Sequence, residues 1–389
     1  MQFLHTSDLH LCDQATSDGA QRLRVLEEIC GKAKDCDALV IAGDVFHDAT
    51  EGENRALRDA VSKLLASVGK PVLIIAGNHD ILRATNGNPL DGQNSFGDNV
   101  KLFTATPFDQ FDLGKVRFYG VPFQPGAAAA DLLRSLPPAD DFHRVGIIHG
   151  TAVDRKSLAM YAQDPESREE GDDLLIHDKD LIDAKFRYTA LGHIHKAESW
   201  SHPDGSKAAY SGSPDMVTVK EEGIRTVNIV TLDENTGAVS LTPEELTSAV
   251  RSKRKTFFAL PGREKKVFEE IKAFVAAEGA QVRPTAYIRG LGSKRLLNEG
   301  KASLEQTFLS RKPAPTIKLR ATELGDDTLE ETGLVKAFLD KMEIRAQEAK
   351  TETEQITIAR ATLLGHLALT GNHKGLDNLR DTAATEDAG

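Results

Sequence analysis

Hydrophobic runs and helical periods alternate over the first eighty residues of the chain. Apolar runs at 2–6, 38–42 and 72–76 are short and adjoin polar or turn-forming residues, which predicts three strands. Between them, hydrophobic residues recur every three or four positions over 23–33 and 56–65, which predicts two helices. A strand–helix–strand–helix–strand order usually gives parallel strands joined by right-handed crossovers. Functional side chains are then expected just beyond the carboxyl ends of the strands.

After residue 100 the pattern changes to shorter apolar runs with few helical periods between them. This favours a second, more antiparallel sheet that packs on the first, and hence an α/β fold. The strands expected here are Val116 to Val121, Arg144 to Ile148, Tyr188 to Leu191, Ala208 to Ser211 and Thr226 to Thr231.

A change of composition near residue 250 indicates a domain boundary, because the acidic stretch Pro243-Glu244-Glu245 gives way to Arg251-Ser252-Lys253-Arg254-Lys255. We predict three parts: a main domain over 1–248, a small α+β domain over 249–322 and a C-terminal helical segment over 323–389. The small domain should contain strands at Thr256 to Leu260, Thr285 to Arg289 and Thr316 to Leu319, and helices at Glu264 to Ala277 and Leu304 to Leu309.

The C-terminal segment contains two predicted amphipathic helices. Their apolar faces either pack on their own domain or form a docking face for a partner helix. The first helix carries Leu334, Val335, Phe338, Leu339 and Met342, and the second carries Ile356, Ala359, Leu363, Leu364 and Leu367.

The composition excludes several classes of protein. Of the 389 residues, 40% are hydrophobic and 28% charged, which is typical of a globular chain and not of a disordered one. No apolar run approaches the ~18 residues of a membrane helix, so no membrane partner is expected. The 3 cysteines (Cys12, Cys30 and Cys36) form no CxxC pair, and the polar motif at Asp8 leaves no room for a signal peptide. A reducing cytoplasm is the expected location.

The net charge of −11 hides an uneven distribution. Residues 251–320 carry 17 Lys and Arg against 6 Asp and Glu, a net charge of +11, whereas 1–250 carry a net −15 and 321–389 a net −7. A local basic block can bind nucleic acid, because Lys and Arg replace the counterions condensed on phosphates. The alternative is a solvated surface with no polyanionic partner.

Polar residues follow five of the predicted strands. Taken singly, each cluster could be a helix cap, a turn or a surface group. Taken together, they supply Asp, Asn or His at one strand end after another, and none supplies Cys. Residues at i and i+2 of an extended chain project to the same side. Asp8 and His10 in the first cluster, and His193 and His195 in the last, can therefore face one site. The clusters are Thr6-Ser7-Asp8-Leu9-His10, Gly43-Asp44-Val45-Phe46-His47, Gly77-Asn78-His79-Asp80, Gly146-Ile147-Ile148-His149-Gly150 and Leu191-Gly192-His193-Ile194-His195.

Oxygen and nitrogen ligands without thiolate suit Mn, Mg, Fe or Zn in an open site and not a closed structural zinc site. The candidate ligands are too many for one ion. Two ions ~3.5 to 4 Å apart that share a carboxylate would use them all, and such a pair suits in-line phosphoryl displacement. The chain has no phosphate-binding G-x-x-x-x-G-K-[ST] loop and no G-x-G-x-x-G turn after the first strand, which argues against an NTPase or a dinucleotide-dependent oxidoreductase.

The motifs DLH, GDVFH, GNHD, IIHG and GHIH occur in that order, and through them the chain resembles the calcineurin-like metallophosphoesterases. The wording of GDVFH and GHIH, together with the appended basic domain, resembles the SbcD-type DNA repair exonucleases. The resemblance covers about residues 1 to 235, including Tyr210-Ser211-Gly212-Ser213-Pro214, which is similar to the family's YxGS segment. It implies a four-layer αββα sandwich with a small α+β cap domain and C-terminal helices.

The resemblance also implies roles for single residues. His79 would assist the leaving oxygen, and Asp80 would orient the ring of His79. His47 would lie near the scissile phosphate. Two divalent ions are implied, usually Mn in this family. Their ligands would be Asp8, His10 and His195 for one ion, Asn78, His149 and His193 for the other, and Asp44 as the bridge.

The implied activity is metal-dependent hydrolysis of DNA phosphodiester bonds, by exonuclease or endonuclease action, in DNA repair. The basic domain would grip DNA, and the C-terminal helices would bind an SbcC-type coiled-coil ATPase; a homodimer is a further option. Two other functions stay open: a calcineurin-like phosphodiesterase or phosphatase for small phosphoesters, and a non-catalytic DNA-binding scaffold for the ATPase.

Overall fold

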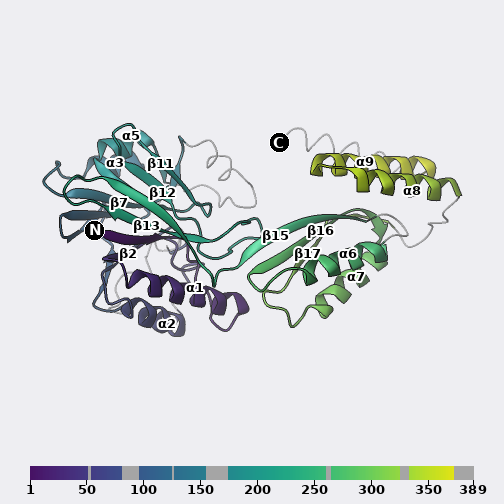
Figure 1. Cartoon of the computed structure of the whole chain (residues 1–389), viewed down its shortest axis with the longest axis horizontal. Helices are drawn as coiled ribbons and strands as arrows, with labels where there is room; N and C mark the ends of the chain where they lie inside the picture. Colours follow the sequence, from purple (N-terminus) through teal and green to yellow (C-terminus); the bar gives the residue numbers. More distant parts are fainter. Residues whose placement is uncertain are drawn as a thin grey trace. The chain divides into compact units, whose positions relative to one another are not determined.

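The computed structural model describes residues 1–50, 54–80, 96–124, 127–154, 174–259, 264–324 and 333–371. The chain divides into two compact units, Met1–Arg251 and Ser252–Gly389 (Figure 1). Each unit has its own hydrophobic core, and each is described separately below. The separate roles predicted for 249–322 and 323–389 remain predictions.

The first sheet of unit 1 has the order β14-β13-β1-β2-β3-β4. Strands β1, β2 and β3 run parallel, as the alternating strand and helix pattern predicted, and β4 continues this parallel arrangement. Strand β13 lies antiparallel to β1, and β14 antiparallel to β13. The strands are β1 (Gln2–Thr6), β2 (Ala38–Ala42), β3 (Val72–Ile75), β4 (Val100–Phe103), β13 (Thr226–Leu232) and β14 (Val239–Glu245).

Helices α1 (Ser17–Ala33) and α2 (Arg55–Ala66) cover the outer face of this sheet. Each begins at a polar cap. The Thr16 hydroxyl accepts from the Gly19 N–H, and the side-chain oxygen of Asn54 accepts from the backbone N–H groups of Ala56 and Leu57. Their buried Leu and Val side chains each contribute ~1.5–3 kcal/mol through burial.

The second sheet has the order β11-β12-β10-β7-β6-β5, and its topology corrects the prediction. Its four central strands are parallel, and only the edge strands β5 and β11 are antiparallel to their neighbours. Parallel strands need a connection that brings the chain back to the edge of the sheet at which each strand begins. Here short helices lie in two of these connections, and they leave little helical periodicity in the sequence. The strands are β5 (Asp109–Leu113), β6 (Val116–Val121), β7 (His143–His149), β10 (Phe186–Gly192), β11 (Glu198–Ser201) and β12 (Lys207–Tyr210).

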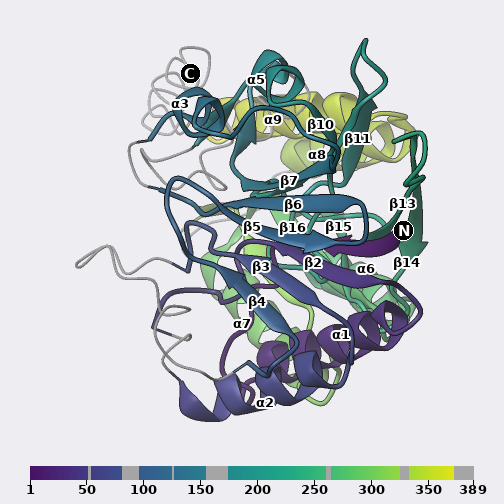
Figure 2. The same ribbon diagram turned by 90° about the vertical axis from the view of Figure 1, so that its left-hand side faces the viewer.

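Those short helices are α3 (Ala129–Arg134), between β6 and β7, and α5 (Asp178–Asp183), between β7 and β10. They lie on the outer face of the second sheet, next to the two-stranded pair β8 (Thr151–Ala152) and β9 (Leu175–Ile176) (Figure 2). Unit 1 is thus a four-layer sandwich of helices, sheet, sheet and helices, which confirms the predicted fold class. A dry core of aliphatic and aromatic side chains fills the space between the sheets.

Unit 2 contains a sheet of four strands: β15 (Arg251–Ala259), β16 (Val282–Ser293), β17 (Thr316–Leu319) and β18 (Thr322–Leu324). Helix α6 (Glu264–Ala276) packs on it through Phe268 and Ile271. Helix α7 (Lys294–Thr307) begins ten residues before the predicted position. Gly300 interrupts its hydrophobic pattern, and a Cβ there would lie 2.1 Å from the Phe268 ring, so the close packing of the two helices needs glycine.

Helices α8 (Gly333–Glu348) and α9 (Glu352–Leu369) form an antiparallel pair in which Gly365 lies against the Phe338 ring. Both helices combine buried and exposed apolar side chains. The buried ones include Val335, Leu339, Met342 and Leu367, and the large exposed ones among the described side chains are Leu334, Ile344, Leu364 and Leu369.

Over the part of the chain that the structure describes, no helix has the length and apolar character needed to cross a membrane.

Candidate metal centre

Five strands of unit 1 lead into one polar site. Strands β1, β2 and β3 are parallel neighbours in the first sheet, and β7 and β10 are parallel neighbours in the second. The carboxyl ends of parallel strands meet at one edge of a sheet. The loops that follow these strands carry the polar residues of the site, and hydrogen bonds link loops of one sheet to those of the other.

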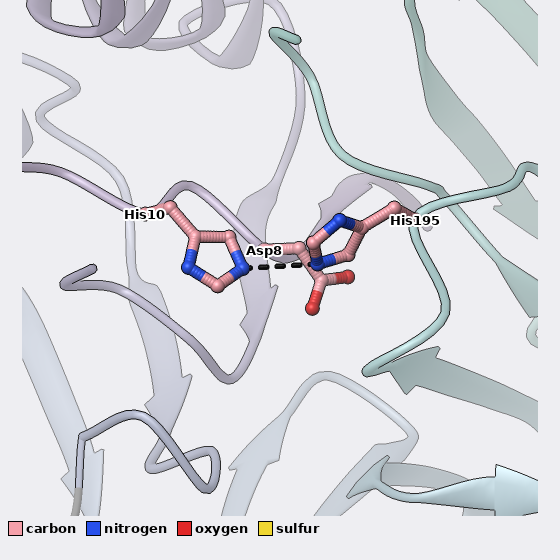
Figure 3. A group of neighbouring side chains, drawn as sticks. All are labelled: Asp8, His10 and His195. Atoms are coloured by element: carbon pink, nitrogen blue, oxygen red, sulfur yellow. Dashed lines mark hydrogen bonds between the residues drawn. The ribbon is translucent and has the colours of Figure 1, made fainter. Parts of the chain in front are cut away.

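Asp8, His10 and His195 form the first group of side chains. One ligand atom from each lies within 4.8 Å of the other two. The Nε2 atoms of His10 and His195 are 3.0 Å apart, and Figure 3 shows the two rings joined at these atoms, with the Asp8 carboxylate beside them. Two imidazole nitrogens so close to each other and to a carboxylate form a donor set that suits a shared cation.

Asn78, His149 and His193 form the second group. The side-chain oxygen of Asn78 lies 2.9 Å from Nε2 of His149 and 3.1 Å from Nδ1 of His193. Nδ1 of His149 lies 2.8 Å from the carbonyl of Ala42, to which it donates, so a neutral His149 ring would present the lone pair of Nε2 to the site. That lone pair and the Asn78 oxygen would both be acceptors, and a shared cation would satisfy both.

Asp44 lies between the two groups. Its Oδ2 is 3.6 Å from Nε2 of His10 and 3.4 Å from Nε2 of His149. Burial would raise the pKa of Asp44, but His149 and His10 hold that pKa well below its usual range. Burial likewise lowers the pKa of His149, yet the Asp44 carboxylate outweighs this effect and raises the pKa to about 9. An ionised carboxylate is therefore shared by both groups.

All seven side chains predicted as metal ligands lie together in this site. Their oxygen and nitrogen donors, all buried or half-buried, suit a pair of divalent ions, and the assignment of each ligand stays a prediction. The ring nitrogen Nδ1 of His10 is buried without a hydrogen-bond partner, which shows how closely the loops enclose the site.

Backbone strain is concentrated in the same loops. Among the described residues, five other than glycine have positive φ, and four of them belong to the site. Such conformations are costly for residues with a Cβ and occur mainly where the surrounding structure holds a functional group in place. The four are Asp8 (φ 53°), His10 (φ 45°), Asp44 (φ 51°) and His193 (φ 100°).

Glycine allows two loops to approach the centre closely. A Cβ at Gly77 would lie 2.1 Å from Oδ1 of Asp44, and a Cβ at Gly43 would lie 2.3 Å from Nδ1 of His149. Gly43 also has a φ of 89°, which favours glycine. Gly77 is therefore required for space, and Gly43 for both space and backbone conformation.

His79 and His47 lie beside the first group. The ring centroids of His10 and His79 are 4.7 Å apart, and the rings of His47 and His79 are nearly parallel at 6.2 Å. Nδ1 of His79 lies 2.7 Å from the backbone carbonyl of His47, to which it donates. This leaves Nε2 of His79 as the ring atom that can exchange a proton with a bound molecule.

The contacts of Asp80 differ from the predicted ones. It does not orient the ring of His79, which is held by the carbonyl of His47. The buried Asp80 carboxylate instead accepts from the backbone N–H groups of Gly77, Val45 and Phe46 at 2.9 to 3.2 Å, and so joins two loops. Burial and the nearby Asp44 raise the pKa of Asp80 to about 6.

Glu221 is a residue of the site that sequence reasoning missed. Its side chain is buried, and Oε1 lies 2.9 Å from Nδ1 of His195. Burial raises the pKa of Glu221, but the contact with His195 and the hydrogen bonds from Val217 and Ser213 together outweigh burial and lower the pKa to about 2. In the sequence, Glu221 lies in the charged run Lys220-Glu221-Glu222, which is typical of an exposed turn. Its distance from His195 along the chain gave no signal of contact.

Comparison with known proteins gives concordant matches. Residues 1–225 match the family model described as calcineurin-like phosphoesterase. Three relatives carry the name DNA double-strand break repair protein Mre11. The protein of Methanopyrus kandleri is 28% identical over 57% of this chain and 50% of its own, that of Haloferax volcanii 27% over 58% and 48%, and that of Sulfurisphaera tokodaii 27% over 57% and 55%. This chain thus spans about half the length of the relatives that it matches.

Proposed function

This chain belongs to the calcineurin-like phosphoesterase family, and from that membership we propose that it is a divalent-metal-dependent DNA nuclease that acts in double-strand break repair. The observation that carries the proposal is the convergence of seven oxygen and nitrogen side chains around the buried Asp44 carboxylate. The three relatives named as DNA repair proteins support DNA as the substrate.

The two groups of side chains correspond to two ion sites. A bound pair of divalent ions would activate water as a nucleophile and neutralise a phosphate ester. Mn is the ion we expect, and Mg, Fe and Zn suit the same donors. We assign Asp8, His10 and His195 to one ion, Asn78, His149 and His193 to the other, and Asp44 to both.

His79 would serve as the general acid. The carbonyl of His47 holds its Nδ1, so a proton on Nε2 can be given to the leaving oxygen of the phosphodiester. The exposed ring of His47, which lies parallel to that of His79, would contact the phosphate flanking the scissile bond. Asp80 would contribute by fixing the two loops that carry these histidines.

Unit 2 would supply affinity for DNA. The three basic residues Lys253, Arg254 and Lys255 of β15 are exposed, and residues 251–320 carry a net charge of +11. Elsewhere in unit 2, Lys318 and Arg320 lie over the buried ring of Tyr287 at 5.8 and 5.1 Å. Basic side chains gathered in one unit suit a phosphate backbone.

The direct test is hydrolysis of duplex DNA labelled at the 5′ or the 3′ end, with Mn or with EDTA, beside a small aryl phosphodiester. We expect Mn-dependent cutting of both substrates and none in EDTA. Cutting of the aryl diester alone would favour a phosphodiesterase for small phosphoesters. DNA binding without cutting of either substrate would favour a scaffold.

Helices α8 and α9 would bind an SbcC-type coiled-coil ATPase through their exposed apolar residues. Size-exclusion chromatography of the chain with a purified coiled-coil fragment of such an ATPase would test this, with Leu334→Glu and Ile344→Glu as variants expected to abolish co-elution. The same experiment on the chain alone would measure whether it forms a homodimer.

A further inference from the structure

Glu221 receives an unusually complete set of hydrogen bonds for a buried carboxylate. Oε1 accepts from the Thr218 N–H at 2.9 Å and lies 2.9 Å from Nδ1 of His195. Oε2 accepts from the Ser213 hydroxyl at 2.7 Å, the Val217 N–H at 3.0 Å and the Arg225 guanidinium at 3.3 Å. Both oxygens are therefore held in fixed positions from two segments of the chain.

This set of donors determines which nitrogen of His195 carries the proton. The ionised Glu221 carboxylate can only accept, so Nδ1 of His195 donates to it, and in the neutral ring Nε2 keeps its lone pair. That lone pair points to Nε2 of His10, 3.0 Å away, and into the group that includes Asp8. Without this carboxylate, nothing in the described contacts of His195 would select that tautomer.

The backbone around Glu221 supports the same arrangement. The Ser213 N–H donates to the carbonyl of His195 at 3.2 Å, while the Ser213 side chain donates to Glu221, so the ring and its partner share one anchor. The preceding Gly212 has a φ of 73°, and a Cβ there would lie 2.9 Å from the carbonyl oxygen of His195. The loop after β12 is thus shaped to bring Ser213 and Glu221 to His195.

We propose that Glu221 is a positioning residue that fixes the tautomer and orientation of His195 for metal binding. This inference rests on the proposed function, because it assigns His195 to an ion. Carboxylate partners of metal-binding histidines typically affect metal affinity by 10–100-fold when removed. Glu221 should therefore act on the affinity of the ion site, through His195 alone.

The decisive variant is Glu221→Gln, which keeps the shape of the side chain but introduces an NH2 donor. An NH2 group in the place of Oε2 would face three donors, so the amide should turn its NH2 toward His195. Nδ1 of His195 would then accept, and its proton would move to Nε2, the ligand atom. Of the two Mn sites, the one that contains His195 should lose affinity by ~10–100-fold.

Mn affinity is measured by calorimetric titration of the metal-free full chain. Glu222→Gln is the matched control, because this neighbouring carboxylate is exposed and Arg225 donates to the main-chain carbonyl of Glu222, which the substitution keeps. Glu221→Asp retains the charge but withdraws it from His195, and should give a smaller loss. It also keeps the test possible if Glu221→Gln does not fold.

Two further measurements separate positioning from general stability. In ¹⁵N-histidine spectra of the metal-free protein, His195 should change from the Nδ1–H to the Nε2–H tautomer in Glu221→Gln, with the signal assigned by its loss in His195→Ala. In a double-mutant cycle, Glu221→Gln should have no further effect on Mn affinity in the His195→Ala background.

The possible results lead to different conclusions. Unchanged Mn affinity in Glu221→Gln, an equal loss in Glu222→Gln, or a loss that persists in the His195→Ala background would each overturn the inference while the proposed function stands. If the wild-type chain binds no divalent ion, the proposed function fails first.

Discussion

The metal centre and the basic unit use polar side chains in opposite ways. In the centre, Asp8, Asp44 and His149 are buried, and their polar atoms face defined partners at fixed distances. In unit 2, Lys253 and Lys255 of β15 are exposed, and their contacts with Glu278 and the Phe257 ring lie at the surface. A buried group acts through its position in a low dielectric, whereas water and salt screen an exposed charge. The centre should therefore respond to the change of single atoms, and the basic unit to the number of charges.

The largest effect is expected at His79, which would test the first half of this comparison. His79→Ala should lower hydrolysis of the aryl phosphodiester by ~10² to 10⁴, because it removes the proposed general acid. The Mn content should stay at the wild-type value, since His79 is not among the assigned ligands. Turnover is measured at saturating Mn, with metal content determined by elemental analysis. Unchanged turnover would remove the role of His79.

Asp215 tests whether a buried carboxylate outside the centre acts on stability instead of hydrolysis. Its Oδ1 accepts from the Val250 N–H at 2.6 Å, and burial raises the pKa of Asp215 to about 6. The unfolded chain ionises nearer pH 4, so this group's contribution to the free energy of unfolding falls as pH rises from about 4 to about 6 and is constant above.

Asp215→Asn cannot ionise, and its amide oxygen can still accept from Val250. Relative to this variant, the wild type should lose up to ~3 kcal/mol of unfolding free energy between pH 4 and pH 7. Denaturant unfolding in EDTA at several pH values measures the difference. Parallel pH profiles for the two proteins would show that Asp215 does not titrate in this range.

Removal of 252–389 tests the second half of the comparison. The remaining chain, 1–251, should retain hydrolysis of the aryl phosphodiester, because all assigned ligands lie within it. Its affinity for duplex DNA should fall by ~10-fold or more at moderate salt, because the basic block is lost. Fluorescence anisotropy with labelled duplex measures this. Equal DNA affinity of both chains would reject unit 2 as the DNA-binding part.

The smallest effect is expected for one exposed charge. Lys255→Gln should weaken DNA binding only slightly, and it should reduce the slope of log affinity against log salt by ~1. A titration series at several salt concentrations would detect this. A large loss that does not depend on salt would mean that Lys255 acts by position, which would contradict the comparison.

The contrast between local and distant contacts explains which features of the structure could be predicted from the sequence. The ligand residues were predictable because each follows an apolar strand, and parallel strands of one sheet bring their ends together, as with Asp8 and Asp44. The two sheets could be recognised from the strands alone. The parallel order of the second sheet could not, because α3 and α5 are each too short to leave a clear helical period.

Other features depended on contacts between residues far apart in the chain. Glu221 reaches His195 only because the loop after β12 turns back on it, and a charged residue in a charged run carries no mark of burial. Asp80 follows His79 directly, which favoured a contact between them. In the structure, the Asp80 oxygens instead accept from three backbone N–H groups, which would otherwise be buried without partners.

The hydrogen bond from His149 to the carbonyl of Ala42 joins β7 of one sheet to β2 of the other. The Asp8 carboxylate does the same by accepting from the backbone of His193. The edge that carries the candidate metal centre is thus also where hydrogen bonds connect the two sheets. Ions bound there as proposed should be released in the same transition that separates the sheets on heating, and the melting temperature should rise with their affinity.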